Sequence, residues 1–241
     1  MKGLMGTSEL PVQTNTSVYF PGKPLSSGQR WIALGELAVG SAIVIGHNVY
    51  HVIPNEVPIL FVLGLLSAQV RDGSWKAVGL RWPVSWQRTI LFALGVAALR
   101  ILLSALVIDP ITAHFWPPAV APSGMNEITG HWKVALQWLL LVWTFAAFGE
   151  EMGYRGYLMT RAADVGNRSP LAYLAALLAS SVLFGYGHYY KGPPGILQST
   201  LSGLILGGAY LLSGRNLWVS IVAHGCADTI AIAAVFFGLA D

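Results

Sequence analysis

The chain has 241 residues, of which 54% are hydrophobic and only 10% are charged, and its mean hydropathy is +0.58. A soluble domain has about 25% charged residues, so this composition excludes one and indicates a polytopic membrane protein. The net charge of +3 comes from basic residues spread over several loops, which favours membrane topology over nucleic-acid binding. A single cysteine, Cys226, excludes an internal disulfide and a cysteine-based metal cluster.

The first thirty residues are rich in Ser, Thr, Pro and Gly, and they lack the basic, apolar and cleavage regions of a secretory signal peptide. We expect residues 1–30 to form a flexible or interfacial tail and residues 31–241 to form a single transmembrane domain. Apolar stretches of about transmembrane length then recur along the chain. The predicted spans are residues 31–50, 57–71, 88–108, 132–160, 171–190, 195–213 and 217–239. The fold class is therefore all-α, a polytopic transmembrane helical bundle of about seven spans, of which the second is short.

Most basic residues fall on one side of these spans. With a cytoplasmic N-terminus, the inner side holds Lys2, Lys23, Arg30, Arg71, Lys76, Arg81, Arg88, Arg155, Arg161, Arg168 and Arg215. Only Lys133 and Lys191 lie outside, and Arg100 lies within the third span. Because cytoplasmic loops carry an excess of Lys and Arg, we expect a cytoplasmic N-terminus. We expect a multi-pass protein of a bacterial or archaeal plasma membrane, with the Glu150 end of the fourth span toward the cytoplasmic half.

The sixth span carries small and polar residues inside an apolar stretch. Gly203 and Gly207 form a small-x-x-x-small pair, which predicts close packing against another helix. Gln198, Ser199 and Ser202 are expected to make hydrogen bonds between helices, with contact to a substrate as the alternative.

The fourth span ends in a charged segment that contains Glu150, Glu151 and Arg155. Ionisable residues at membrane depth are costly and are by default interpreted as functional. On a helix Glu151 and Arg155 stand at i,i+4 and can pair, whereas Glu150 points about 100° away from Glu151. Glu150 is therefore the carboxylate left free for chemistry. The alternative is that the two acids only mark a membrane boundary.

Two later spans add polar residues where apolar ones are expected. His188 ends the fifth span, and His224 and Asp228 stand at i,i+4 on one face of the seventh. Each alone has a structural explanation, such as a histidine satisfied by a carbonyl group. Three spans with ionisable groups predict a shared polar cavity, because none of these groups can face lipid cheaply. Glu150 and His224 have similar predicted depth, but His188 lies nearer the outer end of a straight fifth helix.

Three motifs on three predicted spans resemble those of the CPBP intramembrane proteases: Glu150-Glu151-x-x-x-Arg155, Phe184-x-x-x-His188 and His224-x-x-x-Asp228. The resemblance covers about residues 130–240. That family includes the CAAX-processing enzymes, typified by the Ras-converting enzyme, and Abi-type bacteriocin-immunity proteins. The resemblance implies an intramembrane glutamic endopeptidase that needs no cofactor. Its partners would be the lipid bilayer and a membrane-associated peptide or protein substrate, with or without a lipid modification, and no nucleic acid.

The resemblance also implies roles for these residues. Glu150 and His188 would activate a water for attack on a peptide carbonyl, and His224 and Asp228 would bind that water or the developing oxyanion. A carboxylate withdrawn from water is a stronger base near neutral pH, which agrees with this role for Glu150. Glu151, paired with Arg155, would support the helix. The CAAX-processing branch typically has Asn where this chain has Asp228, and an aspartate donates a hydrogen bond only when it is protonated.

Other functions stay open. A zinc-dependent variant would use Glu150, His188, His224 and Asp228 as ligands, although the histidines come from separate spans without a compact ligand motif. An Abi-type scaffold without catalytic activity would bind another membrane protein, but the intact motifs argue against it. A proton-coupled transporter would use the same groups as a relay, but the internal repeats typical of transporters are not visible. Cys226 is disfavoured as a nucleophile because residues at i,i+2, such as His224, do not face each other.

Overall fold

The computed structural model describes residues 24–122 and 124–239, so most of the predicted tail lies outside the described residues. In these ranges the chain forms helices and connections, without a β-strand. The α-helices are α1 (Ser27–Asn48), α2 (Glu56–Ser67), α3 (Trp86–Leu103), α4 (Asp109–Phe115), α5 (Trp132–Leu141), α6 (Met159–Val165), α7 (Pro170–Tyr186), α8 (Gly192–Leu212) and α9 (Leu217–Phe236). Short 3₁₀ or π-helical segments are η2 (Ala68–Asp72), η3 (Trp75–Val78), η4 (Ser104–Ile108), η5 (Met125–Ile128) and η7 (Tyr189–Lys191), and a longer π-helical segment is η6 (Val142–Leu158).

The structure confirms the predicted helical membrane bundle. Five helices in the described part are long and apolar enough to cross a membrane, namely Ser27–Asn48, Trp86–Phe115, Trp132–Val165, Tyr189–Leu212 and Leu217–Phe236. Helix α7 is also apolar but shorter. Helix α2 has 12 residues, or about 18 Å of helix, which is too short to cross about 30 Å of hydrocarbon alone.

The first helix begins earlier than the sequence predicts. It starts at Ser27 rather than at residue 31, because Ser26 and Gln29 form a capping box in which each side chain accepts a hydrogen bond from the other residue's backbone N–H. The last residues of the predicted tail are therefore helical.

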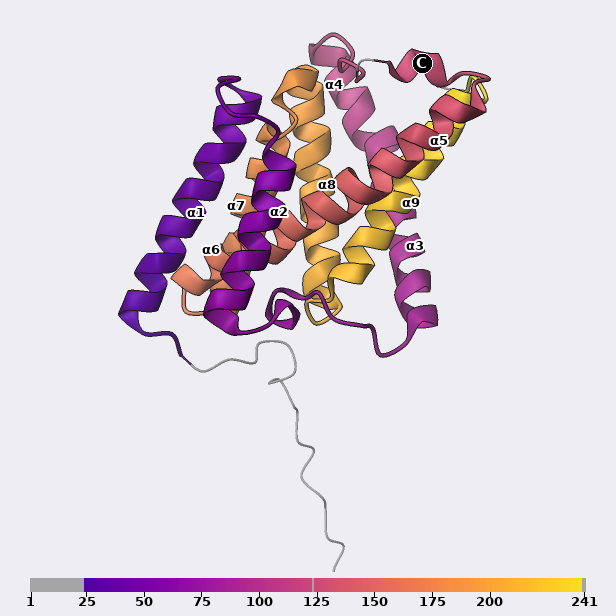
Figure 1. Cartoon of the computed structure of the whole chain (residues 1–241). Coiled ribbons are helices and arrows are strands. Elements are labelled where there is room, and N and C mark those ends of the chain that lie inside the picture. Colours follow the sequence, from indigo (N-terminus) through magenta and orange to yellow (C-terminus); the bar gives the residue numbers. More distant parts are fainter. Residues whose placement is uncertain (1–23, 123, 240–241) are drawn as a thin grey trace, which may run out of the picture.

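A long tilted helix crosses the bundle diagonally. It consists of α5, η6 and α6 in sequence, and Figure 1 shows it running between α1 and α2 on one side and α3 and α9 on the other. Its η6 segment is mostly buried, with Ala147, Met152 and Leu158 fully so. Since this segment also carries the charged motif, the most enclosed part of the bundle positions Glu150, Glu151 and Arg155.

The helix pair α7 and α8 confirms the packing predicted from small residues. A Cβ atom on Gly203 would lie 2.8 Å from the Cα atom of Ser181 on α7. A Cβ on Gly207 would lie 2.5 Å from a methyl group of Leu177 on the same helix. The two helices can approach this closely only because both positions lack side chains.

The connections between helices gather at two ends of the bundle (Figure 1). We call one the basic end, because it includes Arg30, Arg71, Lys76, Arg81, Arg88, Arg161, Arg168 and Arg215. There the backbone N–H of Leu217 donates to the carbonyl of Gly79 over 3.0 Å. We call the other the far end; it holds residues 49–55, 116–122 and 187–191 and the C-terminus of α9.

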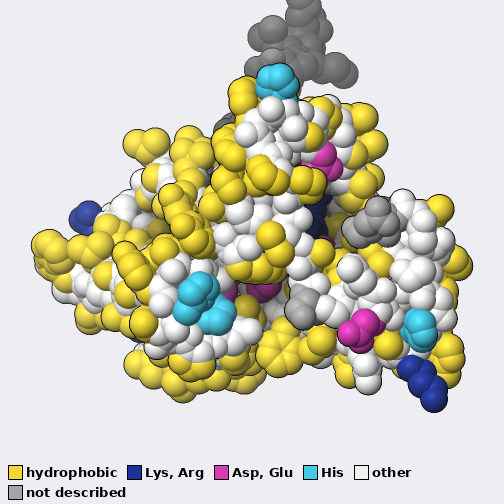
Figure 2. Space-filling view, turned by 90° about the horizontal axis from the view of Figure 1, so that it is seen from above, with side chains coloured by type: hydrophobic (Ala, Val, Ile, Leu, Met, Phe, Trp, Pro, Cys, Tyr) yellow, Lys and Arg dark blue, Asp and Glu magenta, His cyan; other side chains and the backbone are white. Residues whose placement is uncertain are grey.

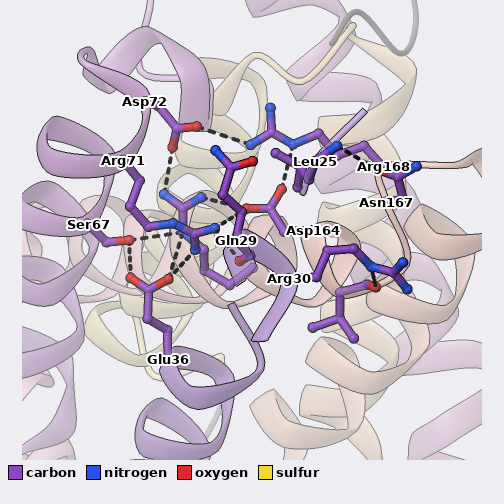
Figure 3. A network of polar contacts seen from close by, with 12 residues as sticks. Leu25, Gln29, Arg30, Glu36, Ser67, Arg71, Asp72, Asp164, Asn167 and Arg168 are labelled. Carbon is purple, nitrogen blue, oxygen red and sulfur yellow. Dashed lines mark hydrogen bonds and ion pairs between the residues drawn. The ribbon is translucent and has the colours of Figure 1, made fainter. Parts of the chain in front are cut away.

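An ionic network ties the helices together at the basic end (Figure 3). Arg161, which is fully buried, lies 2.6 Å from Asp72 and 2.7 Å from Asp164, and it donates to the Ser67 hydroxyl over 2.9 Å. Arg168 binds Asp164 and Asp72 as well, at 2.5 and 3.0 Å. The network therefore connects η2 to α6 and to the loop that follows α6.

The same network continues to α1. Arg71 forms an ion pair with Glu36 of α1 and lies 3.6 Å from Asp164. The sequence identifies Arg71 and Arg161 only as markers of one membrane side. A buried arginine needs a carboxylate partner, because an unpaired buried charge costs several kcal/mol. The structure supplies these carboxylates from α1, η2 and α6.

Candidate active site

A cavity of about 480 Å³ lies between η6, α7, α8, α9 and α3. Glu150, His188, His224 and Asp228 all line it, so the structure brings the four residues predicted as catalytic into one space. Its remaining walls are mostly apolar and come from the chain before α5 and from α5 and α9. Cys226 is not among the described residues that line this cavity.

Glu151 is the first member of a chain of contacts beside the cavity. The predicted pair is present, with Arg155 Nη1 2.8 Å from Glu151 Oε1 and both side chains buried. Arg155 also donates to the Gly203 carbonyl over 3.4 Å, and its guanidinium lies 4.4 Å from the centre of the Phe184 ring. The same Glu151 oxygen lies 2.8 Å from His224 Nδ1, a contact that spacing along the chain does not predict.

His224 lies between two carboxylates. Its Nδ1 contacts Glu151, and its Nε2 lies 3.3 Å from Asp228 Oδ2. A ring nitrogen donates to a carboxylate only when it carries a hydrogen, so both contacts are hydrogen bonds only in the protonated ring. This arrangement therefore holds His224 as a cation rather than as a base.

Arg100 lines the cavity, although the sequence does not identify it as a site residue. Its Nη1 lies 2.9 Å from Asp228 Oδ1, and its Nε donates to the Ser202 hydroxyl over 3.0 Å. The signal was an arginine inside the third span, where an unpaired charge is costly. The sequence does not name its partner, because Arg100 and Asp228 are 128 residues apart. Asp228 is thus bound by two cations.

Two of the three polar residues of α8 make the hydrogen bonds between helices that the sequence predicts. Gln198 donates to Asp109 of α4 over 2.6 Å, and Ser202 accepts from Arg100, so both make hydrogen bonds between helices. Gln198, Ser199 and Ser202 also line the cavity.

Glu150 differs from the other carboxylates of the site. Its Oε2 atom and Glu151 Oε2 are both buried without a hydrogen-bond partner within the described residues. Glu151, in contrast, is bound through its other oxygen by Arg155 and His224, and Asp228 is bound by Arg100 and His224. Glu150 is therefore the carboxylate of this cavity whose binding capacity is least satisfied.

His188 reaches the cavity from the turn after α7. Helix α7 ends at Tyr186, and His188 Nδ1 lies 3.0 Å from the Phe184 carbonyl. Since a carbonyl oxygen only accepts, Nδ1 carries the hydrogen and, in the neutral ring, Nε2 carries the free lone pair. The Phe184 ring centre is 4.9 Å from that of His188 and 6.2 Å from that of His224. The tilt of α5, η6 and α6 brings Glu150 to the same cavity, which removes the expected offset in depth.

No group of three or more His, Cys, Asp or Glu side chains suited to a metal ion occurs within residues 24–122 and 124–239. The cavity residues face one another in pairs with arginines and with a histidine instead. The zinc-dependent alternative therefore has no preformed ligand group in this arrangement.

Residues 132–230 match the family model of Rce1-like proteins, described as type II CAAX prenyl endopeptidase Rce1-like. The matched segment begins with α5, ends within α9, and contains Glu150, His188, His224 and Asp228. No curated protein and no solved structure matches the chain. Through this segment, the chain is similar to the CAAX-type proteases of the CPBP family.

Proposed function

We propose that this protein is an intramembrane endopeptidase that hydrolyses a peptide bond of a membrane-associated protein or peptide with a water activated by Glu150 and His188. The observation that carries the proposal is the contrast between Glu150 and its neighbours. Glu150 and Glu151 each have one buried oxygen without a partner, but arginines bind Glu151 and Asp228, whereas the ion pairs among the described residues do not include Glu150. A general base must be free to accept a proton from water, and Glu150 is.

His188 supports the same step. Its free Nε2 lone pair can accept a hydrogen bond from the water that Glu150 deprotonates. The hydroxide then attacks the carbonyl carbon of the substrate. As the C–N bond breaks, the proton held by Glu150 passes to the departing amine nitrogen, so that one water is consumed and the base is restored.

Positive charge beside the cavity supports stabilisation of the oxyanion. Arg155, His224 and Arg100 are linked through two carboxylates, Glu151 and Asp228, so the group carries one excess positive charge once Glu150 has taken the proton of the water. Preorganised charge of this kind is a large contribution to catalysis of acyl transfer. In place of the amide of an asparagine, the Asp228–Arg100 pair supplies N–H donors. Asp228 thus acts as a positioning residue.

Replacement of Glu150 tests the mechanism. Glu150→Gln keeps the shape of the side chain but cannot take a proton from water at neutral pH, so cleavage should fall by about 10²-fold or more while the folded protein is retained. The matched control is Glu127→Gln, which changes an exposed acid. The probe is a library of membrane-anchored peptides, each with a fluorophore and a quencher, reconstituted with the protein in liposomes.

Two outcomes would count against this proposal. Wild-type cleavage that persists in Glu150→Gln contradicts the glutamate mechanism. If the folded wild type cleaves no member of the library, the scaffold of the Abi type becomes the better interpretation.

A further inference from the structure

The mouth of the cavity lies at the far end of the bundle. Val120 and Tyr190 line the cavity and are 59% and 47% exposed, whereas His224 is 4% exposed and lies at its floor. The backbone N–H of Val120 donates to the Lys191 carbonyl over 3.4 Å, which joins the two segments that frame the mouth. Figure 2 views this end and shows charged side chains set back between apolar groups near its middle.

The route to the site from the basic end is filled. From Arg155 to Asp164 the tilted helix is buried almost continuously, and Leu158 and Met159 have no exposed surface. Closer to the basic end, Arg161 is fully buried between Asp72 and Asp164, which are labelled in Figure 3. Water and peptide therefore reach Glu150 from the far end.

The basic residues assign the two ends to the two sides of the membrane. Among the described residues, eight Lys and Arg residues lie at the basic end, and Lys133 and Lys191 lie at the far end. Lys191 lines the cavity rather than an open loop, which explains one of these two exceptions. Counts of Lys and Arg determine orientation even where acids accompany them, so the ion pairs of the basic end do not weaken the assignment.

We infer that the cavity opens to the extracytoplasmic side of the membrane, so that the substrate is the outward-facing part of a membrane-associated protein or peptide. That a substrate enters the cavity rests on the proposed function, whereas the direction in which the cavity opens does not. Tyr190 lines the mouth, and two further exposed aromatic residues, Trp116 and Tyr189, lie in the connections of the far end. Trp and Tyr favour the membrane–water interface, which places the mouth at the level of the lipid headgroups. The site thus suits a chain that emerges from lipid on the outer face, and a cytoplasmic carboxyl-terminal tail does not reach it.

Cysteine accessibility tests the inference without any substrate. In a Cys226→Ser background, Ala121→Cys marks the mouth, Ser104→Cys marks the cavity wall, and Lys76→Cys marks the basic end. A membrane-impermeant maleimide is applied to intact bacterial cells with a permeabilised outer membrane and to inverted membrane vesicles. We expect Ala121→Cys and Ser104→Cys to be labelled in cells and Lys76→Cys to be labelled only in inverted vesicles.

Each other result overturns the inference. Labelling of Ser104→Cys only in inverted vesicles shows an opening at the basic end, and labelling of Lys76→Cys in cells shows the opposite orientation. Failure of Ser104→Cys to react from either side in protein that elutes as a single folded species shows a closed cavity.

A cleavage assay separates this inference from the proposed function. Membrane-anchored quenched peptides are placed with the cleavable segment outside or inside the cell, and we expect loss of quenching only for the outside segment. If neither is cleaved but the labelling pattern holds, the proposed function fails and the direction of the opening stands. Cleavage of the inside segment alone overturns the inference.

Discussion

Replacement of Asp228 by asparagine removes the charge that lies between two cations. In the structure Asp228 Oδ1 is 2.9 Å from Arg100 Nη1, and Asp228 Oδ2 is 3.3 Å from His224 Nε2. After Asp228→Asn, Arg100 and His224 share only a neutral amide. The change is nearly isosteric, so its effect reports charge rather than packing.

The magnitude follows from burial. Breaking a fully buried ion pair by removing one partner costs roughly 3–5 kcal/mol, because the remaining charge is left without compensation. The side chains of Arg100 and Asp228 are 21% and 24% exposed, so water offsets part of this penalty. We therefore expect Asp228→Asn to lower the free energy of unfolding by about 2–3 kcal/mol.

A double-mutant cycle measures the pair directly. Arg100→Gln alone leaves Asp228 paired only with His224. Asp228→Asn alone leaves Arg100 without its carboxylate, and the combined variant removes this unpaired cation as well. We expect the double variant to be more stable than the sum of the two single losses predicts, by about 1–3 kcal/mol. The assay is equilibrium unfolding by SDS in mixed micelles, followed by tryptophan fluorescence. The control cycle of Arg100→Gln with Glu127→Gln should be additive.

Additivity in the first cycle would refute this reasoning. If the two losses add within about 0.5 kcal/mol, Arg100 and Asp228 do not act as a pair in the folded protein. The proposal that Asp228 positions Arg100 beside the cavity would then be withdrawn.

Three further results are expected. Arg155→Ala should lower the yield of folded protein more than the activity of each folded molecule, since it leaves Glu151 with one cation fewer at a cost of roughly 3–5 kcal/mol; an inactive variant with normal yield and unfolding would contradict this. Strong chelators should leave wild-type cleavage unchanged if a glutamate activates the water, whereas loss of cleavage that zinc restores would favour the zinc-dependent variant. Burial opposes the ionisation of Asp72, but hydrogen bonds and charges from Arg161 and Arg168 outweigh it and hold the pKa of Asp72 below 3.8. Because this pKa is lowered by folding, the stabilisation is present above the unfolded-state pKa and is lost as pH falls through the folded-state pKa. Asp72→Asn should therefore lower the free energy of unfolding at neutral pH and make it depend less on pH below about pH 4. An unchanged pH dependence in that range would argue against the ion pairs of Asp72 with Arg161 and Arg168.

The sequence by itself determined the features that depend on local geometry. Apolar stretches predicted the helical bundle, because a span in lipid must satisfy its own backbone hydrogen bonds. The Glu151–Arg155 pair followed from i,i+4 spacing, and the packing of Gly203 on α7 followed from its missing side chain. The motif that contains Glu150 also led to the family.

Only the tertiary structure decided which partners meet across the bundle. Arg100 binds Asp228, and His224 binds Glu151 from 73 residues away, because of how the helices tilt and rotate against each other. Periodicity along one helix carries no information about that rotation. The diagonal course of α5, η6 and α6 likewise brings Glu150 into the cavity that His188 lines, and it buries Arg161 among acids of other helices. Such contacts depend on packing between distant segments, which local sequence patterns do not specify.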